Sequence, residues 1–239
     1  MPRMRILNTV ERYDFDFPPT FNSLQRKKYF YFSDTLYHMV SGLRSPAHQV
    51  GFLISCGYFL ATKKFFAANE FRAVDVEYVT QKLGLPDVLV NLHEYNDRTR
   101  QKHQQTILKY YGYQAFSSQA KAFLNEEINI MVRSQLKPRL IFWRCIDLLI
   151  REKVQLPGCF TLTDLITAVI NRRKDQLVNI IQQQLSSEAK QALEALFEQT
   201  PVFGEQHPGA TSAYRLTLLK KLSQSARPAK IKERVVDLV

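Results

Sequence analysis

The chain has 239 residues, of which 45% are hydrophobic, and it carries a formal net charge of +11. This apolar fraction can fill one large core or two small ones, and it excludes a chain that is disordered throughout. The positive charge indicates a polyanionic partner, because net charge bears on association rather than on fold. Nucleic acid is favoured over an anionic membrane surface, since neither a basic amphipathic helix with a lipid-facing side nor a lipidation motif stands out.

The first helices follow an arm that is expected to be extended. This arm contains "FDFPPTF". Helical periodicity then predicts a helix from Asn22 to Phe30 and a second helix capped by Ser33 or Asp34. The N-terminal stretch "MPRMRILNTVERYDFDF" lacks the apolar core of a secretory signal, so the chain is expected to stay in the cytoplasm.

The apolar run from Val50 to Ala61 is the most hydrophobic stretch of this first half. At twelve residues it is too short to cross a membrane, which takes roughly 20. Its periodicity predicts a helix buried on most sides, with Ser45 as N-cap and Pro46 at the first helical position. Gly51 and Gly57 are expected to let neighbouring backbones approach closely.

The remaining elements are also predicted to be helical. The stretch "AVDVEYVTQKLGLP" predicts a helix that ends at Gly84 and closes a bundle of about four short helices. A second group is then expected, with helices from Asn96 or Asp97 to Gly112, from Ser118 to Arg133, from Pro138 to Lys153, from Thr161 with Asp164 in capping-box position, and from Ser186 or Ser187 to Glu198.

These elements predict an all-α protein, because strand alternation is almost absent. The predicted domains are residues 1–88, residues 89–200, and a loop with the start of a further helical region over residues 201–239. The loop "TPVFGEQHPGATS" is rich in proline and glycine, and one or two helices are expected in the tail up to Val239.

No enzyme is indicated by the motifs of the chain. It has no glycine-rich phosphate loop, HExxH, paired CxxC or G-x-S-x-G sequence, and its histidines lack metal-ligand spacing. Its three cysteines are far apart and are expected to be reduced core residues (Cys56, Cys145 and Cys159). No cofactor, metal site or catalytic residue is therefore predicted.

Basic residues cluster at helix starts and turns, in "QRKK" at 25–28, at Lys63 and Lys64, in "RTRQKHQQ" at 98–105 and in "NRRK" at 171–174. The helix that contains "RTRQKHQQTILKYY" has the composition of a recognition helix, because arginine and glutamine suit guanine and adenine edges in a major groove. Arg100 and Gln104 are predicted to contact bases, Lys102 to act through its charge, and His103 to pack near Ile107. The alternative is a solvated helix face.

Several motifs in the same order resemble the N-terminal region of transposases of the Tn-three family. They are "MPRMRIL…ER", "YFYFSDTLYHMVSGLRSPAHQVGFLISCGYFLATKKFF", "YVTQKLGLP", "RTRQKHQQTILKYYGYQAF" and "LIREKVQLPGCFTLTDLI". The chain departs from the family pattern at His48 and Gln49, where many members have Asn-Arg, and between Tyr95 and Thr99, which is a residue or two shorter. The stretch "YRLTLLKKLSQSARPAKIKERVVDLV" resembles the start of the family's next helical region and then stops, so a fragment or decayed remnant is expected.

The resemblance implies paired helix-turn-helix domains, similar to those of centromere protein B, that bind the terminal inverted repeats of a transposon. Catalysis in that family belongs to a separate RNase-H-like domain with three acidic residues and two metal ions, so this chain is expected not to cut DNA. Its expected location is the cytoplasm, at the nucleoid when bound, without a membrane partner. A homodimer within a full-length transposase and a helical module for RNA or protein partners remain open alternatives. The predicted DNA contacts are Arg44, His48, Gln49, Lys63, Lys64, Arg98, Thr99, Arg100, Gln101, Lys102, Gln104, Gln105, Arg172, Arg173 and Lys174.

Overall fold

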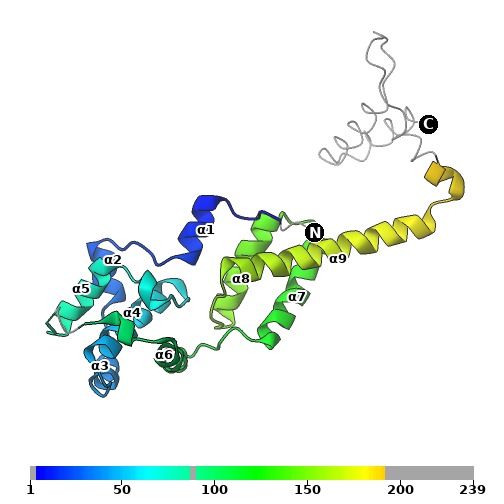
Figure 1. Cartoon of the computed structure of the whole chain (residues 1–239). Helices are drawn as coiled ribbons and strands as arrows, with labels where there is room; N and C mark the ends of the chain where they lie inside the picture. The colour runs from blue at the N-terminus through cyan, green and yellow to red at the C-terminus, as the bar shows by residue number, and fades with distance from the viewer. Residues whose placement is uncertain (1–3, 87–89, 192–239) are drawn as a thin grey trace, which may run out of the picture. The chain divides into compact units, whose positions relative to one another are not determined.

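The computed structural model describes residues 4–86 and 90–191, and within these ranges the chain is all-helical, as predicted. Figure 1 shows the order of the helices along the chain. They are α1 (Thr9–Asp16), α2 (Ser23–Tyr29), α3 (Asp34–Ser41), α4 (Pro46–Thr62), α5 (Ala73–Lys82), α6 (Asp97–Tyr111), α7 (Ser118–Arg133), α8 (Pro138–Arg151) and α9 (Cys159–Gln184), with the short 3-10 helices η1 (Ala68–Glu70) and η3 (Leu92–Glu94). None of the helices in the described ranges combines the length and the hydropathy that a membrane span requires.

The first core surrounds α4, which is buried on most sides as the apolar run predicts. Ser45 caps this helix by accepting from the backbone N–H of His48 at 3.4 Å, and Pro46 takes the first helical position. The two glycines allow aromatic rings to approach, not only backbones: a Cβ on Gly57 would lie 2.2 Å from Phe30 Cε1, and one on Gly51 would lie 2.6 Å from Tyr95 Cδ1. A side chain at either position would displace a buried ring.

Helix α6 packs into this first core. Its Ile107 and Leu108 are buried in the same cluster as Phe52 and Phe59 of α4. The predicted division between residues 88 and 89 placed α6 with the later helices. In the structure its apolar side chains share a core with α2–α5.

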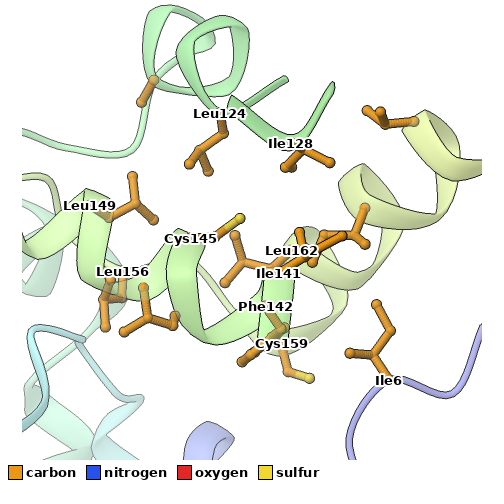
Figure 2. Packing of buried hydrophobic residues seen from close by; sticks show 14 of the residues in the cluster. Ile6, Leu124, Ile128, Ile141, Phe142, Cys145, Leu149, Leu156, Cys159 and Leu162 are labelled. Carbon is orange, nitrogen blue, oxygen red and sulfur yellow. The ribbon is translucent and has the colours of Figure 1, made fainter. Parts of the chain in front are cut away.

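The second core consists of side chains from α7, α8 and the first part of α9, together with Ile6 and Leu7 from the segment before α1. Figure 2 shows Leu124 and Ile128 of α7 facing Ile141 and Cys145 of α8. All three cysteines of the chain are free and buried, as predicted, and burial raises the pKa of the Cys145 thiol to about 12.

The N-terminal arm differs from the prediction, because α1 occupies part of the segment that was expected to be extended. Asn8 accepts from the N–H of Glu11 at 2.8 Å, and the Glu11 carboxylate accepts from the N–H of Asn8 at 3.0 Å. This capping box satisfies two of the free donors at the helix start. The proline pair after Phe17 favours extended structure, but it follows this short helix and does not prevent it.

The start of α9 was also predicted wrongly. The helix begins at Cys159, two residues before the predicted Thr161, so Thr161 and Asp164 lie inside it. Its first turn is capped by a distant carboxylate, since the N–H of Cys159 donates to Oδ1 of Asp16 at 2.9 Å. A cap supplied from another helix leaves no local sequence signal.

Lys64 connects the two cores through the same carboxylate. This residue is only 6% exposed, and its Nζ donates to the carbonyl oxygen of Phe15 and to Asp16 Oδ1 at 3.2 Å. The ammonium also lies 3.9 Å from the ring centroid of Phe15. Burial lowers the pKa of Lys64, while the Asp16 carboxylate opposes that shift. We call Asp16, Lys64 and Cys159 the Asp16 node.

A second unit begins at Asp175, and its described part is residues 175–191. Here α9 exposes the apolar side chains Leu177, Val178, Ile180 and Ile181. Ser186 Oγ accepts from the N–H of Ala189 at 3.2 Å and caps a helix that starts at residue 187. The predicted helix end at Glu198 and the predicted region 201–239 lie outside the described residues.

Lys64→Met is expected to lower the free energy of unfolding by about 2–4 kcal/mol, because it leaves the Asp16 carboxylate without its buried cation. The control is Arg151→Met, which removes a cation from an exposed pair with Glu152 and should cost less than about 1 kcal/mol. Urea unfolding at pH 7 measures both changes. Equal losses in the two variants would contradict the role given to Lys64.

Candidate nucleic-acid interface

Helix α6 is held by caps at both ends. Asn96 Oδ1 accepts from the N–H of Thr99 at 3.0 Å at its start. At its end Gly112 has φ +67°, and the N–H of Tyr113 donates to the carbonyl oxygen of Leu108 at 2.8 Å. Both ends agree with the prediction, because asparagine caps and left-handed glycines are local signals.

The outer face of α6 is polar and basic. Its exposed side chains recur at the three- and four-residue spacing of one helix face. We call the basic and amide side chains among them the α6 stripe, which consists of Arg98, Gln101, Lys102, Gln105 and Lys109, while Asp97 and Thr106 are also exposed on this helix. Four of the five were predicted as contacts, and Lys109 was not.

Arg100 does not belong to this stripe, which corrects the prediction that it points outward. Its side chain is 21% exposed, Nη1 donates to the carbonyl oxygen of Phe66 at 3.3 Å, and Nη2 lies 2.9 Å from Asp97 Oδ1. Gln104, its predicted partner, is half-buried. Arg100 lies seven residues before the buried Ile107, and this spacing places it on the inner face.

The inner face of α6 rests on a group of rings. His103 is buried, as predicted, and its Nδ1 lies 3.1 Å from the Tyr95 hydroxyl. The ring of Phe52 meets His103 edge to face at 5.1 Å between centroids. Burial and the nearby His48 lower the pKa of His103 to about 4. Its imidazole is therefore neutral at pH 7 and acts in packing.

His48 and Gln49 have contacts within the fold. His48 Nε2 lies 3.3 Å from the carbonyl oxygen of Glu94, and Gln49 Nε2 donates to the carbonyl oxygen of Leu43 at 3.4 Å. Both side chains are half-buried, whereas Arg44 before them is exposed. Within this predicted trio, Arg44 is the residue most available to a ligand.

The other predicted cations are divided between structural and exposed positions. The ammonium of Lys64 belongs to the Asp16 node, so its predicted DNA contact is corrected to a structural role. Lys63 Nζ donates to the carbonyl oxygen of Leu60 at 2.8 Å, and burial lowers the pKa of this lysine. Arg172 and Lys174 are exposed on α9, and Arg173 is half-buried.

The cluster at residues 25–28 is similarly mixed. Arg26 Nε pairs with Asp75 Oδ1 at 2.7 Å, and this carboxylate also accepts from the Tyr58 hydroxyl at 2.9 Å. Lys27 and Lys28 are exposed in the last turn of α2. Across residues 4–86 and 90–191, no group of three or more His, Cys, Asp and Glu side chains could hold a metal ion.

A family model described as a domain of unknown function, DUF4158, matches residues 6–169 of this chain. The matched segment includes α6 and the buried residues of both cores. It ends at Val169 of α9, before the exposed part of that helix.

His103 is expected to make the protein less stable in acid. Its pKa of about 4 in the folded state lies below the ordinary 6.5, so the stabilisation is complete above pH 6.5 and is lost as the pH falls toward 4. The loss should approach about 1 kcal/mol per pH unit within that window. His103→Gln should be less stable at pH 7 and show a smaller decline between pH 6.5 and 4.5 in urea unfolding, with exposed His93→Gln as control. An unchanged slope in His103→Gln would refute this assignment.

Proposed function

We propose that the chain, which belongs to the DUF4158 family, binds double-stranded DNA at transposon terminal inverted repeats. The proposal starts from the association of this domain with transposases of the Tn-three family. The chain would act as the non-catalytic N-terminal part of a transposase and position the ends for a catalytic domain elsewhere. Paired helix-turn-helix domains similar to those of centromere protein B are part of this proposal.

The observation that carries the proposal is the division of α6 into two faces. His103, Ile107 and Leu108 bury the inner face in the first core, and the α6 stripe leaves the outer face polar and basic. An α-helix with its side chains is about 10–12 Å in diameter, which fits a major groove that is about 12 Å wide. The fold thus presents hydrogen-bonding side chains on a rigid helix, and this rigidity favours base recognition over a merely solvated surface.

The side chains of the stripe suggest different tasks. Arg98 can donate two hydrogen bonds to the O6 and N7 atoms of guanine, and Gln101 and Gln105 can pair with adenine. Lys102 and Lys109 are suited to phosphates, because an ammonium is a point charge without the planar geometry of a guanidinium. The exposed Arg44, Arg172 and Lys174 would add phosphate contacts.

Duplex binding should depend steeply on salt. The logarithm of the association constant is expected to fall against the logarithm of salt concentration with a slope of about −0.9 per phosphate contacted. Fluorescence anisotropy with long random duplex measures this slope, and single-stranded RNA serves as competitor. A slope near zero would refute DNA binding, and preferential binding of the RNA would favour the alternative of an RNA module.

With Mg²⁺ or Mn²⁺ the purified chain should leave supercoiled plasmid intact, and nicking lost on mutation of its own carboxylates would refute a non-catalytic role.

Arg98→Ala is expected to cost roughly 1–3 kcal/mol on a duplex selected from a random pool and much less on random duplex, because it removes a base contact. Lys102→Ala should weaken both duplexes alike and reduce the salt slope by about one unit. Gln81→Ala, an exposed change on α5, is the control and should alter neither binding constant. If Arg98→Ala weakens both duplexes equally, α6 contacts phosphates only, and base recognition must lie elsewhere.

A further inference from the structure

Four helices end in the same hydrogen-bonded motif, but two of them use a residue that is strained there. The N–H groups of Leu85, Tyr113, Leu136 and Val154 each donate to the carbonyl oxygen five residues earlier, at 2.8 to 3.2 Å. The left-handed residue of this motif is glycine after α5 and α6, at Gly84 and Gly112. After α7 and α8 it is Gln135 with φ +56° and Lys153 with φ +52°. Glycine adopts this conformation without strain, and a residue with a Cβ does not.

The backbone of Lys153 is fixed where the two cores meet. Its N–H donates to the carbonyl oxygen of Ile150 at 3.1 Å, and its own carbonyl oxygen accepts from the N–H of Gln114 at 2.8 Å. Close by, the N–H of Leu156 donates to the carbonyl oxygen of Lys63 at 3.0 Å. Lys153 therefore follows α8 of the second core but lies beside the end of α6.

The side chain of Lys153 extends the α6 stripe. Gly112 is exposed and lies three residues after Lys109, so it takes the next position on that face. The ammonium of Lys153 lies 4.0 Å from the point that a Cβ of Gly112 would occupy. The ammonium of Lys153, at the end of α8, thus lies beside Gly112, where α6 itself has no side chain.

Lys153 is exposed, and no residue of the described ranges holds its ammonium by a hydrogen bond or an ion pair. At the equivalent positions the protein has glycine after α5 and α6 and Gln135 after α7, so the strained conformation alone does not identify a function for Lys153. Such strain clusters at functional sites, and the unpaired ammonium gives Lys153, unlike Gln135, a charge that an anionic ligand can bind. A favourable interaction with the carbonyl groups at the helix ends is the competing explanation.

We propose that Lys153 contacts a DNA phosphate at the C-terminal end of α6, so that the second core takes part in binding the same duplex. The proposal rests on the duplex binding proposed above and adds a contact from outside α6. Lys153 is matched to the phosphate backbone because it supplies a mobile point charge, not a planar hydrogen-bonding group.

Lys153→Gly separates the two explanations, because it removes the charge and relieves the backbone strain at once. The expected results are a binding constant for random duplex that falls about threefold to tenfold and a salt slope that decreases by about one unit. The thermal unfolding midpoint should stay the same or rise by about 1–4 °C. Lys153→Arg, which keeps the charge, should bind duplex as the unaltered chain does.

Gln135→Gly is the matched control, since it relieves the same strain after α7 without changing charge. It should raise the unfolding midpoint by a similar amount and leave duplex binding unchanged. An unchanged binding constant and salt slope in Lys153→Gly, measured against an unaltered chain with a steep slope, would overturn the contact while leaving the proposed function intact. A salt slope near zero in the unaltered chain itself would refute the proposed function first, and the contact with it.

Discussion

The structure from α1 to the start of α9 depends on one buried ammonium. Lys64 follows directly after the central helix of the first core, and its charge is compensated by Asp16 at the end of α1. The same carboxylate caps α9 through Cys159, so one oxygen serves two cores. Removing an ion pair from water is unfavourable unless its remaining hydrogen-bonding capacity is satisfied. Here a backbone carbonyl and an aromatic face satisfy the cation, and a helix N-terminus satisfies the anion.

This connection determines what α6 can do. The helix is packed on the first core, while its C-terminal end meets Lys153 of the second core, and the Asp16 node holds the two cores together nearby. Two flexibly linked bundles would each have to be ordered on a ligand, at an entropic cost for the second. Two bundles that are joined in the folded protein are already ordered relative to each other, so binding does not incur this entropic cost. The surface around α6 is consequently a property of both bundles, although each has its own hydrophobic cluster.

Local signals made much of the helical fold predictable from the sequence, and a distant contact accounts for the wrongly predicted start of α9. Ser45 before Pro46, Asn96 before α6 and Gly112 after it act within a few residues, and all were recognised. The start of α9 depends on Asp16, which is 143 positions away, so no local pattern could reveal it. The capping box of α1 was different, because the asparagine and the glutamate three residues later were visible and were overlooked.

The candidate site was predictable only as a set of helix positions. Composition identified α6, and periodicity could have placed Arg100 on the inner face with Ile107, since seven residues are nearly two turns. Arg100 was predicted to contact bases because of its residue type, and the helix face on which it lies was not considered. Lys153 could not be found in this way, because its place beside Gly112 arises from the meeting of two helix ends. Lys64 was predicted to contact DNA, and its structural role could not be predicted, because the sequence does not show whether a lysine is buried.

The 33 lysine and arginine residues of the chain therefore overstate the number of cations that can face a ligand. Within the described residues, several cations have partners inside the fold. Arg26 pairs with Asp75, Arg72 donates to the carbonyl oxygen of Pro18, Lys82 donates to that of Phe30, and Lys64 and Arg100 are held as described. Cations held in this way release few counterions when DNA binds, because their charge is already satisfied. The salt dependence of binding should follow the exposed cations of α6 and its neighbours, so it reports on the geometry of the surface and not on the total charge.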